Sequence, residues 1–178
     1  LICNFISNFK TQGYQLEQFD KFRASTKNIR TDLFLEICSI CYLEYQKALK
    51  ENHCIDFQDM INESADIIHK RLISRDLLDF KYIIVDEYQD ISRQRYNLIR
   101  ELSQLCHAKI VAVGDDWQSI YAFSGSILPL FTRFSQEVSY AQELKITHTY
   151  RNAQEIIDIA GTFIQKNSNQ IKKKTNIT

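Results

Sequence analysis

Residues Lys81–Asp90 read KYIIVDEYQD, and this stretch decides the fold. Its apolar part, Tyr82–Val85, is short and rich in β-branched residues, which is the pattern of a strand buried on both faces. A second apolar run, KIVAVG, occupies Lys109–Gly114. Between the two runs Ser92 is a good N-cap residue, and apolar residues follow it at helical spacing, at Leu98, Ile99, Leu102 and Leu105. Strand, helix and strand in this order predict a βαβ unit of a parallel sheet, so the expected fold class is α/β.

Helices are expected before and after this unit in the sequence. Asp32–Lys50 has helical periodicity, with an apolar stripe at Leu33, Ile37, Ile40, Cys41 and Ala48. Asp56 can cap a second helix, whose apolar side carries Met60, Ile61, Ile68 and Leu72. Farther along, a short helix is expected near Pro129, a third strand at Glu143–Thr147, and a helix opened by Asn152.

Composition limits the class of protein. The chain has 178 residues, 44% of them hydrophobic and 25% charged, as in an ordinary globular protein. The formal net charge is zero, so any contact with nucleic acid must come from a local surface or from stacking. No window approaches 18 uncharged apolar residues, so no membrane span is expected. The N-terminal residues LICNFISNFK lack a basic leader, so we expect no signal peptide.

The cysteines favour a reducing compartment. There are five, irregularly spaced, which suits free thiols in a cytoplasmic protein. Cys38 and Cys41 have CxxC spacing, and His53 and Cys54 follow, so a zinc site is conceivable. However, Cys38 and Cys41 coincide with the apolar stripe of a predicted helix, which favours small buried hydrophobic residues.

Two acidic pairs follow the two predicted strands. Asp86 and Glu87 come after the first strand, and Asp115 and Asp116 come after the second. Ligands of parallel sheets bind beyond the carboxyl ends of the strands, so the two pairs indicate a site for a divalent cation and a polarised water. Asp86 is expected to reach the metal, and Glu87 to orient or deprotonate the water. Asp90 is expected to hold the loop by hydrogen bonds.

The loop after the second strand is rich in aromatic residues. Val113–Ser126 reads VGDDWQSIYAFSGS, and its aromatic residues flank Gln118. Tyr121 and Phe123 are two residues apart, so in an extended chain they share a face and form a stacking platform for bases. For Trp117, ordinary packing is as good an explanation.

These motifs together resemble those of a known family. VDEYQD, then VGDDWQSIYAFSG, then ITHTYRNAQEIIDIA are similar to motifs II, III and IV of superfamily 1 helicases of the UvrD/Rep type. IDFQDMI at Ile55–Ile61 is similar to the family's segment before motif II, and Trp117 with FSG looks closest to the helicase IV branch. The resemblance covers Ile55 to about Asn167, and the N-terminal helices match only in general character.

The resemblance implies a role for each matching residue. For the nucleotide, it implies Mg²⁺ at Asp86, a catalytic base for ATP hydrolysis at Glu87, and a γ-phosphate sensor coupled to the DNA groove at Gln118. Tyr150 would pack on the adenine, and Arg151 would reach the γ-phosphate.

It implies single-stranded DNA stacked on Tyr121 and Phe123. The chain also departs from the family pattern. Ser124 stands where many relatives have Arg, and Trp117 stands where the residue is often acidic.

One expected motif is missing. A nucleotide-binding motor needs a phosphate loop of the form GxxxxGK[ST], and none of Gly13, Gly114, Gly125 and Gly161 is followed by Lys. The resemblance therefore implies an internal fragment, inactive by itself, of a RecA-like P-loop NTPase with a parallel sheet. In this interpretation residues 1–52 belong to a helical insertion, residues 53–135 to the C-terminal half of the first motor domain, and residues 136–178 to the start of the second.

Three functional hypotheses remain open. The leading one is part of a cytoplasmic DNA translocase that uses ATP and Mg²⁺, moves 3′ to 5′ on single-stranded or double-stranded DNA, and serves a process such as DNA repair. A second is the helicase part of a helicase–nuclease. A third is a non-catalytic module that binds DNA or a protein partner such as RNA polymerase. The joint presence of Asp86, Glu87, Gln118 and Arg151 argues against a decayed, non-catalytic module.

Overall fold

The chain divides into two compact units, each described by itself. The computed structural model describes residues 1–138, 140–168, 170–172 and 176–177. Unit 1 comprises Leu1–Ile84 and Ser92–Val111, and unit 2 comprises Val85–Ile91 and Ala112–Thr178.

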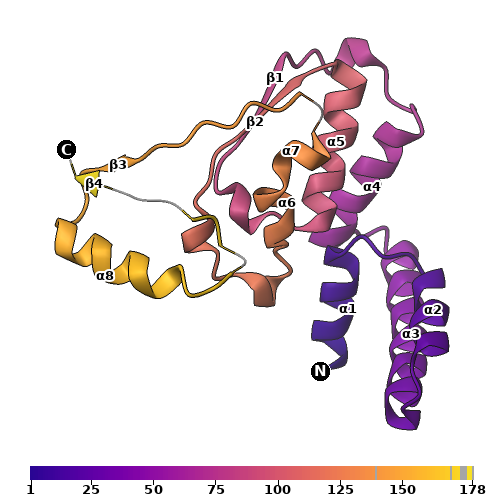
Figure 1. Cartoon of the computed structure of the whole chain (residues 1–178). Helices are drawn as coiled ribbons and strands as arrows, with labels where there is room; N and C mark the ends of the chain where they lie inside the picture. The colour runs from indigo at the N-terminus through magenta and orange to yellow at the C-terminus, as the bar shows by residue number, and fades with distance from the viewer. Residues whose placement is uncertain (139, 169, 173–175, 178) are drawn as a thin grey trace. The chain divides into compact units, whose positions relative to one another are not determined.

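Unit 1 is built mainly from helices (Figure 1). These are α1 (Ile2–Thr11), α2 (Glu17–Ser25), α3 (Ile29–Glu51), α4 (Phe57–His69), the 3₁₀ helix η1 (Arg75–Leu77) and α5 (Arg93–Cys106). The predicted cap of α4 is confirmed, because the Asp56 side chain accepts a hydrogen bond of 2.7 Å from the Asp59 amide. α3 begins three residues before the predicted Asp32, because the Asn28 side chain accepts from the Arg30 and Thr31 amides.

The first core of unit 1 is aromatic. Its buried residues are Phe9, Phe19, Leu35 and Cys38, and the Phe9 and Phe19 rings stack with centroids 4.2 Å apart. Burial of Cys38 as a small hydrophobic residue is confirmed. The predicted stripe on α3 is wrong: Leu33, Ile37 and Ile40 are exposed, and the face turned to the core carries Phe34, Leu35, Cys38 and Tyr42. Because α3 has apolar residues on both faces, periodicity could not distinguish the buried one.

The second core of unit 1 lies beneath the strands. Strands β1 (Tyr82–Val85) and β2 (Lys109–Ala112) pair with each other. The Lys109 amide donates to the Lys81 carbonyl (3.0 Å), and the Val113 amide donates to the Val85 carbonyl (2.9 Å). Residue numbers increase in the same direction along both strands from the first bond to the second, so the strands are parallel. The βαβ prediction is therefore confirmed. In unit 1, Ile83 packs with a buried cluster formed by Ile68, Leu105, Cys106 and Ala108.

One detail of the βαβ prediction is wrong, and a second is confirmed in position only. β1 is buried on one face only. Its Ile83 side packs against the cluster to which α5 contributes, whereas Tyr82 and Ile84 on the other face are exposed. Ser92 does occupy the N-cap position of α5, but its side chain forms no capping hydrogen bond.

Unit 2 consists of short elements. They are the 3₁₀ helices η2 (Tyr88–Asp90), η3 (Asp116–Gln118) and η4 (Ala122–Ser124), the helices α6 (Leu128–Thr132), α7 (Phe134–Glu137) and α8 (Gln154–Ile164), and the strands β3 (His148–Thr149) and β4 (Asn176–Ile177). β3 and β4 pair in parallel, and α6 confirms the short helix expected near Pro129.

Two boundaries in unit 2 differ from prediction. Glu143–Thr147 forms no strand, and the strand begins at His148 instead. Leu144 and Ile146, whose apolar side chains suggested a strand, are exposed to solvent. α8 begins at Gln154 after Ala153, two residues beyond the expected cap Asn152, and no side chain caps it. Among the residues described in either unit, no helix is both long and apolar enough to cross a membrane.

Candidate functional site

The candidate site begins where β1 ends. The Asp86 Oδ1 atom accepts a hydrogen bond of 2.9 Å from the Glu87 amide, and Glu87 has a left-handed backbone (φ 50°). Left-handed conformation is uncommon outside glycine and is frequent at functional sites. It turns the chain from β1 into η2, where the Tyr88 amide donates to the Val113 carbonyl (2.9 Å). The buried Tyr88 ring anchors the turn, and both carboxylates remain exposed.

Gln89 links the ends of the two strands. Its side chain is buried; Nε2 donates to Glu87 Oε2 (2.7 Å), and Oε1 accepts from the Asp115 amide (2.9 Å). Gly114 allows this approach, because a Cβ atom there would lie 2.5 Å from Gln89 Oε1. Sequence reasoning missed Gln89; the available signal was a glycine at the end of the second strand.

Asp115 extends the connection to Gln118. Its Oδ1 atom accepts from the Trp117 amide (3.1 Å), and its Oδ2 atom accepts from Gln118 Nε2 (2.9 Å). A continuous set of hydrogen bonds therefore joins Glu87, Gln89, Asp115 and Gln118, which we call the Glu87–Gln118 network. The structure brings together Glu87 and Gln118, which lie on separate strand ends in the sequence.

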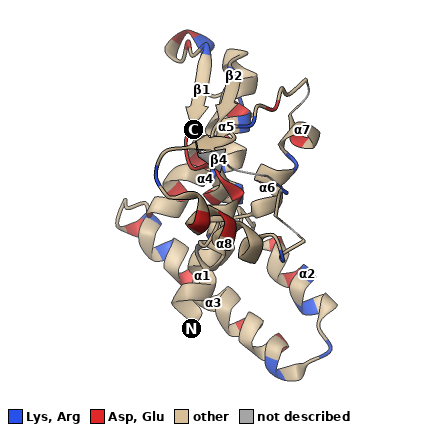
Figure 2. Cartoon of the chain, turned by 60° about the vertical axis from the view of Figure 1, so that its left-hand side comes forward, with Lys and Arg blue, Asp and Glu red and all other residues tan. Residues whose placement is uncertain are grey.

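The second acidic pair does not act as a unit. Figure 2 shows acidic segments in red beyond the ends of β1 and β2. Asp116, however, is only 2% exposed, and its Oδ2 atom accepts from the Ile171 amide (2.6 Å). The expectation of a cation site between two complete acidic pairs is therefore wrong, because η3 turns Asp116 inward.

A cation can still fit at the Asp86 carboxylate. Among the described side chains, no group of three or more His, Cys, Asp or Glu residues could hold a metal by itself. Mg²⁺ at nucleotide sites typically takes one or two carboxylates and completes its shell with phosphates and water. The exposed Asp86 carboxylate fits that requirement, and it follows the carboxyl end of a parallel strand, where ligands of such sheets bind.

Asp90 lies on the buried side of the same turn. Burial first, and then the negative charge of Glu87, raise the pKa of Asp90 above its ordinary value. Its Oδ1 atom is buried without a hydrogen-bond partner in the described part of the chain, and its Oδ2 atom lies 3.5 Å from Gln89 Nε2. The expectation that Asp90 holds the loop by hydrogen bonds is thus met by one long contact only.

The two predicted stacking residues lie together in unit 2. Tyr121 and Phe123 are exposed, Phe123 by 77%, and their ring centroids are 5.9 Å apart at an angle of 53°. The segment was expected to be extended, but it forms η4 instead. η4 ends before Gly125, which has φ 92°. The rings still form one exposed aromatic surface.

Tyr150 and Arg151 lie on a different segment from the residues of the Glu87–Gln118 network. Both follow β3 and are exposed, and the Arg151 amide lies 3.4 Å from Thr149 Oγ1. Among the described residues, no hydrogen bond, ion pair or ring contact joins either of them to the Glu87–Gln118 network.

Comparison with known proteins gives a consistent result. Residues 1–139 match the family profile described as the UvrD/REP helicase N-terminal domain. The chain is 35% identical over 163 residues to DNA helicase IV of Escherichia coli, covering 89% of this chain and 23% of that protein. It is 29% identical over 175 residues to the ATP-dependent DNA helicase PcrA of Leuconostoc citreum, covering 97% and 22%. DNA helicase II of Rickettsia typhi is 31% identical over 175 residues, covering 97% and 26%. The chain thus spans about a quarter of the length of these relatives.

Proposed function

The chain belongs to the UvrD/REP helicase family, and on that premise we propose that it is an internal part of an ATP-dependent DNA helicase that translocates 3′ to 5′ on single-stranded DNA. The relatives named above support this, and the helicase IV branch is favoured by the 35% identity to DNA helicase IV. We propose residues 1–52 as part of a helical insertion, residues 53–135 as the C-terminal half of a first RecA-like domain, and residues 136–178 as the start of a second. A DNA substrate also favours the cytoplasm as its location.

The observation that carries the proposal is the Glu87–Gln118 network at the carboxyl ends of two parallel strands. In the proposed reaction Glu87 accepts a proton from the attacking water. The hydrogen bond from Gln89 Nε2 (2.7 Å) fixes the Glu87 carboxylate, so its second oxygen can be directed at that water. Asp115 holds the Gln118 amide in a defined orientation (2.9 Å). If a γ-phosphate displaced Gln118, the change would therefore be transmitted to Glu87 through two residues only, Asp115 and Gln89.

The remaining proposed roles concern binding. Asp86 would hold Mg²⁺, which neutralises charge that develops on the phosphates. Tyr150 would pack on the adenine, and Arg151 would approach the γ-phosphate after a movement of the segment that carries it. Tyr121 and Phe123 would stack on DNA bases, a contact that needs no basic surface and so agrees with a net charge of zero.

The phosphate-binding loop is a separate part of the proposal. The 178 residues contain no GxxxxGK[ST] segment, so we propose that this stretch alone does not hydrolyse ATP. Phosphate release by the 178-residue chain, measured with ATP, Mg²⁺ and single-stranded DNA, should equal the background. Release above background that Glu87→Gln abolishes would contradict this part of the proposal.

The decisive experiment uses the longer protein that contains this chain. Asp86→Ala and Glu87→Gln should each lower ATP hydrolysis by about 10²–10⁴-fold, because each removes a group that acts on the reacting atoms. Affinity for single-stranded DNA, measured by fluorescence anisotropy without nucleotide, should remain, because both variants leave the exposed Tyr121–Phe123 pair unchanged. Equal loss of hydrolysis and DNA binding in both variants would refute the assigned roles.

A further inference from the structure

Two residues of η3, Asp116 and Trp117, form side-chain hydrogen bonds that are not part of the Glu87–Gln118 network. Asp116 is buried, and its Oδ2 atom accepts from the Ile171 amide (2.6 Å). Trp117 Nε1 donates to the Ile171 carbonyl (3.2 Å). Two adjacent side chains thus satisfy both backbone polar groups of one residue that lies 55 positions away from Asp116. A double contact of this kind fixes position and orientation together, as a single hydrogen bond does not.

Helix α8 provides the other side of this contact. Gly161 is the buried residue of α8, and a Cβ atom there would lie 3.2 Å from Cη2 and 3.4 Å from Cζ3 of Trp117. These distances are tighter than ordinary packing, so glycine is what lets the indole ring lie against the helix. Glycine in a helix interior costs up to about 1 kcal/mol relative to alanine, a cost that the ring contact can offset. Trp117 is therefore held by packing on one side and by a hydrogen bond on the other.

The same three-residue helix carries Gln118. η3 spans only Asp116–Gln118, so one short turn joins the buried Asp116 and the half-buried Trp117 to the exposed Gln118 side chain. We propose that Asp116 and Trp117, with Ile171 and Gly161, form a clasp that positions Gln118, so that movement of α8 and movement of Gln118 are coupled. Asp116 and Trp117 are positioning residues in this proposal, which rests on the proposed function for the role of Gln118. The clasp itself is a property of the 178-residue chain and requires no nucleotide.

The clasp is tested first without ATP or DNA. Hydrogen exchange of the Ile171 amide, followed by NMR, should accelerate about tenfold in Asp116→Ala, the size of one charge-assisted hydrogen bond. Asp116→Asn keeps an acceptor oxygen and should preserve most of the protection. Phe123→Ala is the matched control, because Phe123 is exposed on the same loop, and it should leave Ile171 unchanged. Equal exchange in the wild type and Asp116→Ala would overturn the clasp.

Trp117 supplies a second readout. It is the single tryptophan of the chain, so fluorescence excited selectively at the indole reports the surroundings of Trp117. Asp116→Ala and Gly161→Val should shift its emission to longer wavelength, because each allows water to reach the indole. Emission unchanged in both variants, with the fold verified by circular dichroism, would also overturn the clasp.

The positioning role is tested in the longer protein. Trp117→Ala should lower kcat for ATP hydrolysis about tenfold, because a misplaced group loses rate rather than substrate affinity. The KM for ATP should change by less than about twofold. Trp117→Phe keeps the ring contact and should recover most of kcat. An unchanged kcat in Trp117→Ala would overturn the positioning role even if exchange at Ile171 accelerates, whereas hydrolysis surviving in Asp86→Ala would refute the proposed function and leave the clasp intact.

Discussion

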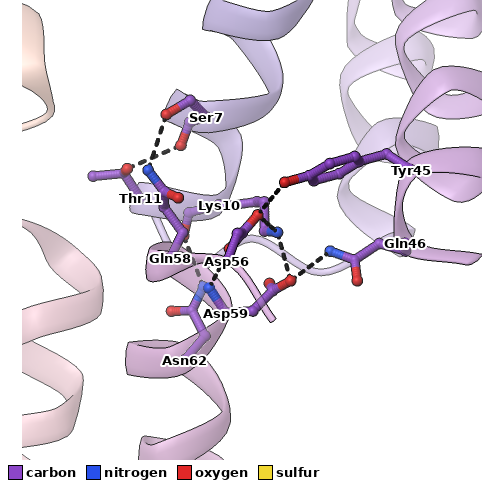
Figure 3. A network of polar contacts seen from close by, with 9 residues as sticks. All are labelled: Ser7, Lys10, Thr11, Tyr45, Gln46, Asp56, Gln58, Asp59 and Asn62. Carbon is purple, nitrogen blue, oxygen red and sulfur yellow. Dashed lines mark hydrogen bonds and ion pairs between the residues drawn. The ribbon is translucent and has the colours of Figure 1, made fainter. Parts of the chain in front are cut away.

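Two polar clusters in this chain use carboxylates in opposite ways. In unit 1, Lys10 is only 2% exposed, and its Nζ atom forms ion pairs with Asp56 and with Asp59, the latter at 2.6 Å (Figure 3). The Tyr45 hydroxyl donates to Asp56 (2.9 Å), and Gln46 Nε2 donates to Asp59 (3.0 Å). In unit 2, the Glu87–Gln118 network is built from carboxylates and amides. Among the residues that the structure describes, Asp86 and Glu87 form no ion pair.

The difference separates a cluster that joins secondary-structure elements from the network that we propose to be functional. The five residues of the Lys10 cluster (Lys10, Tyr45, Gln46, Asp56 and Asp59) come from α1, α3, α4 and the cap of α4, so they tie these elements together. Within the cluster the positive charge of Lys10 offsets one of the two carboxylate charges, and Tyr45 and Gln46 donate hydrogen bonds to the carboxylates as well. The exposed carboxylates of Asp86 and Glu87 are oriented by neutral donors, which leaves their charge available to a cation or a proton.

The largest expected effect on this comparison comes from Lys10→Met. The substitution leaves two partly buried carboxylates side by side without a cation, so the free energy of unfolding should fall by about 3–5 kcal/mol. The measurement is urea denaturation at pH 7. Glu87→Gln is the matched change in the other cluster, and its exposed side chain should alter stability by no more than about 0.5 kcal/mol.

A combined variant sharpens the Lys10 prediction. Lys10→Met together with Asp56→Asn and Asp59→Asn removes the uncompensated charge and should recover most of the lost stability. If the combined variant were no more stable than Lys10→Met alone, packing of the lysine stem rather than charge balance would be the function of the cluster.

The aromatic residues of the two units give the next largest contrast. Phe9 is buried in the core of unit 1, whereas Phe123 is exposed in unit 2. Phe9→Ala should lower the free energy of unfolding by about 3–5 kcal/mol. Phe123→Ala should leave stability nearly unchanged and weaken single-stranded DNA binding by the longer protein by about 1–3 kcal/mol. A titration showing unchanged DNA affinity would place Phe123 outside the DNA path.

Local patterns predicted the elements better than their burial. The strand at Tyr82–Val85 and the cap at Asp56 follow from residues within a few positions, and both are as predicted. The buried face of α3 depends on which side meets α1 and α2, which periodicity does not contain. The exposure of one face of β1 could not be predicted for the same reason. An apolar run does not indicate how many neighbouring elements will cover the strand.

The candidate site shows the same limit. The positions of Asp86 and Glu87 at a strand end could be predicted, because a strand and its end are local features. Gln89 contacts a residue 26 positions away, and Gly114 was the one local signal of that approach. Asp116 contacts a residue 55 positions away, and that contact has no signal in the neighbouring residues. The inward direction of Asp116 therefore emerged only from the packing of η3.

The smallest expected effect is a pH dependence of opposite sign at Asp56 of the Lys10 cluster and at Asp90, which adjoins the Glu87–Gln118 network. Burial raises the pKa of Asp56, but hydrogen bonds from Lys10, the Asp59 amide and Tyr45 outweigh it and lower the pKa below the ordinary 3.8. The stability that Asp56 contributes is therefore complete above that value and is lost as pH falls through its folded pKa. The pKa of Asp90 is raised by burial and by Glu87, so its charged form costs stability at neutral pH, and this cost disappears as pH falls through its folded pKa.

The same substitution at both positions tests this difference. At pH 7, Asp56→Asn should destabilise the protein by about 1 kcal/mol, the size of a single hydrogen bond, and Asp90→Asn should stabilise it. Asparagine caps helices as well as aspartate does, so the cap of α4 should survive in Asp56→Asn. Thermal unfolding between pH 3 and pH 7 should show both differences shrinking toward the acid end of the range. If the two variants shift stability in the same direction at pH 7, the carboxylates of Asp56 and Asp90 do not differ in the way that their contacts indicate.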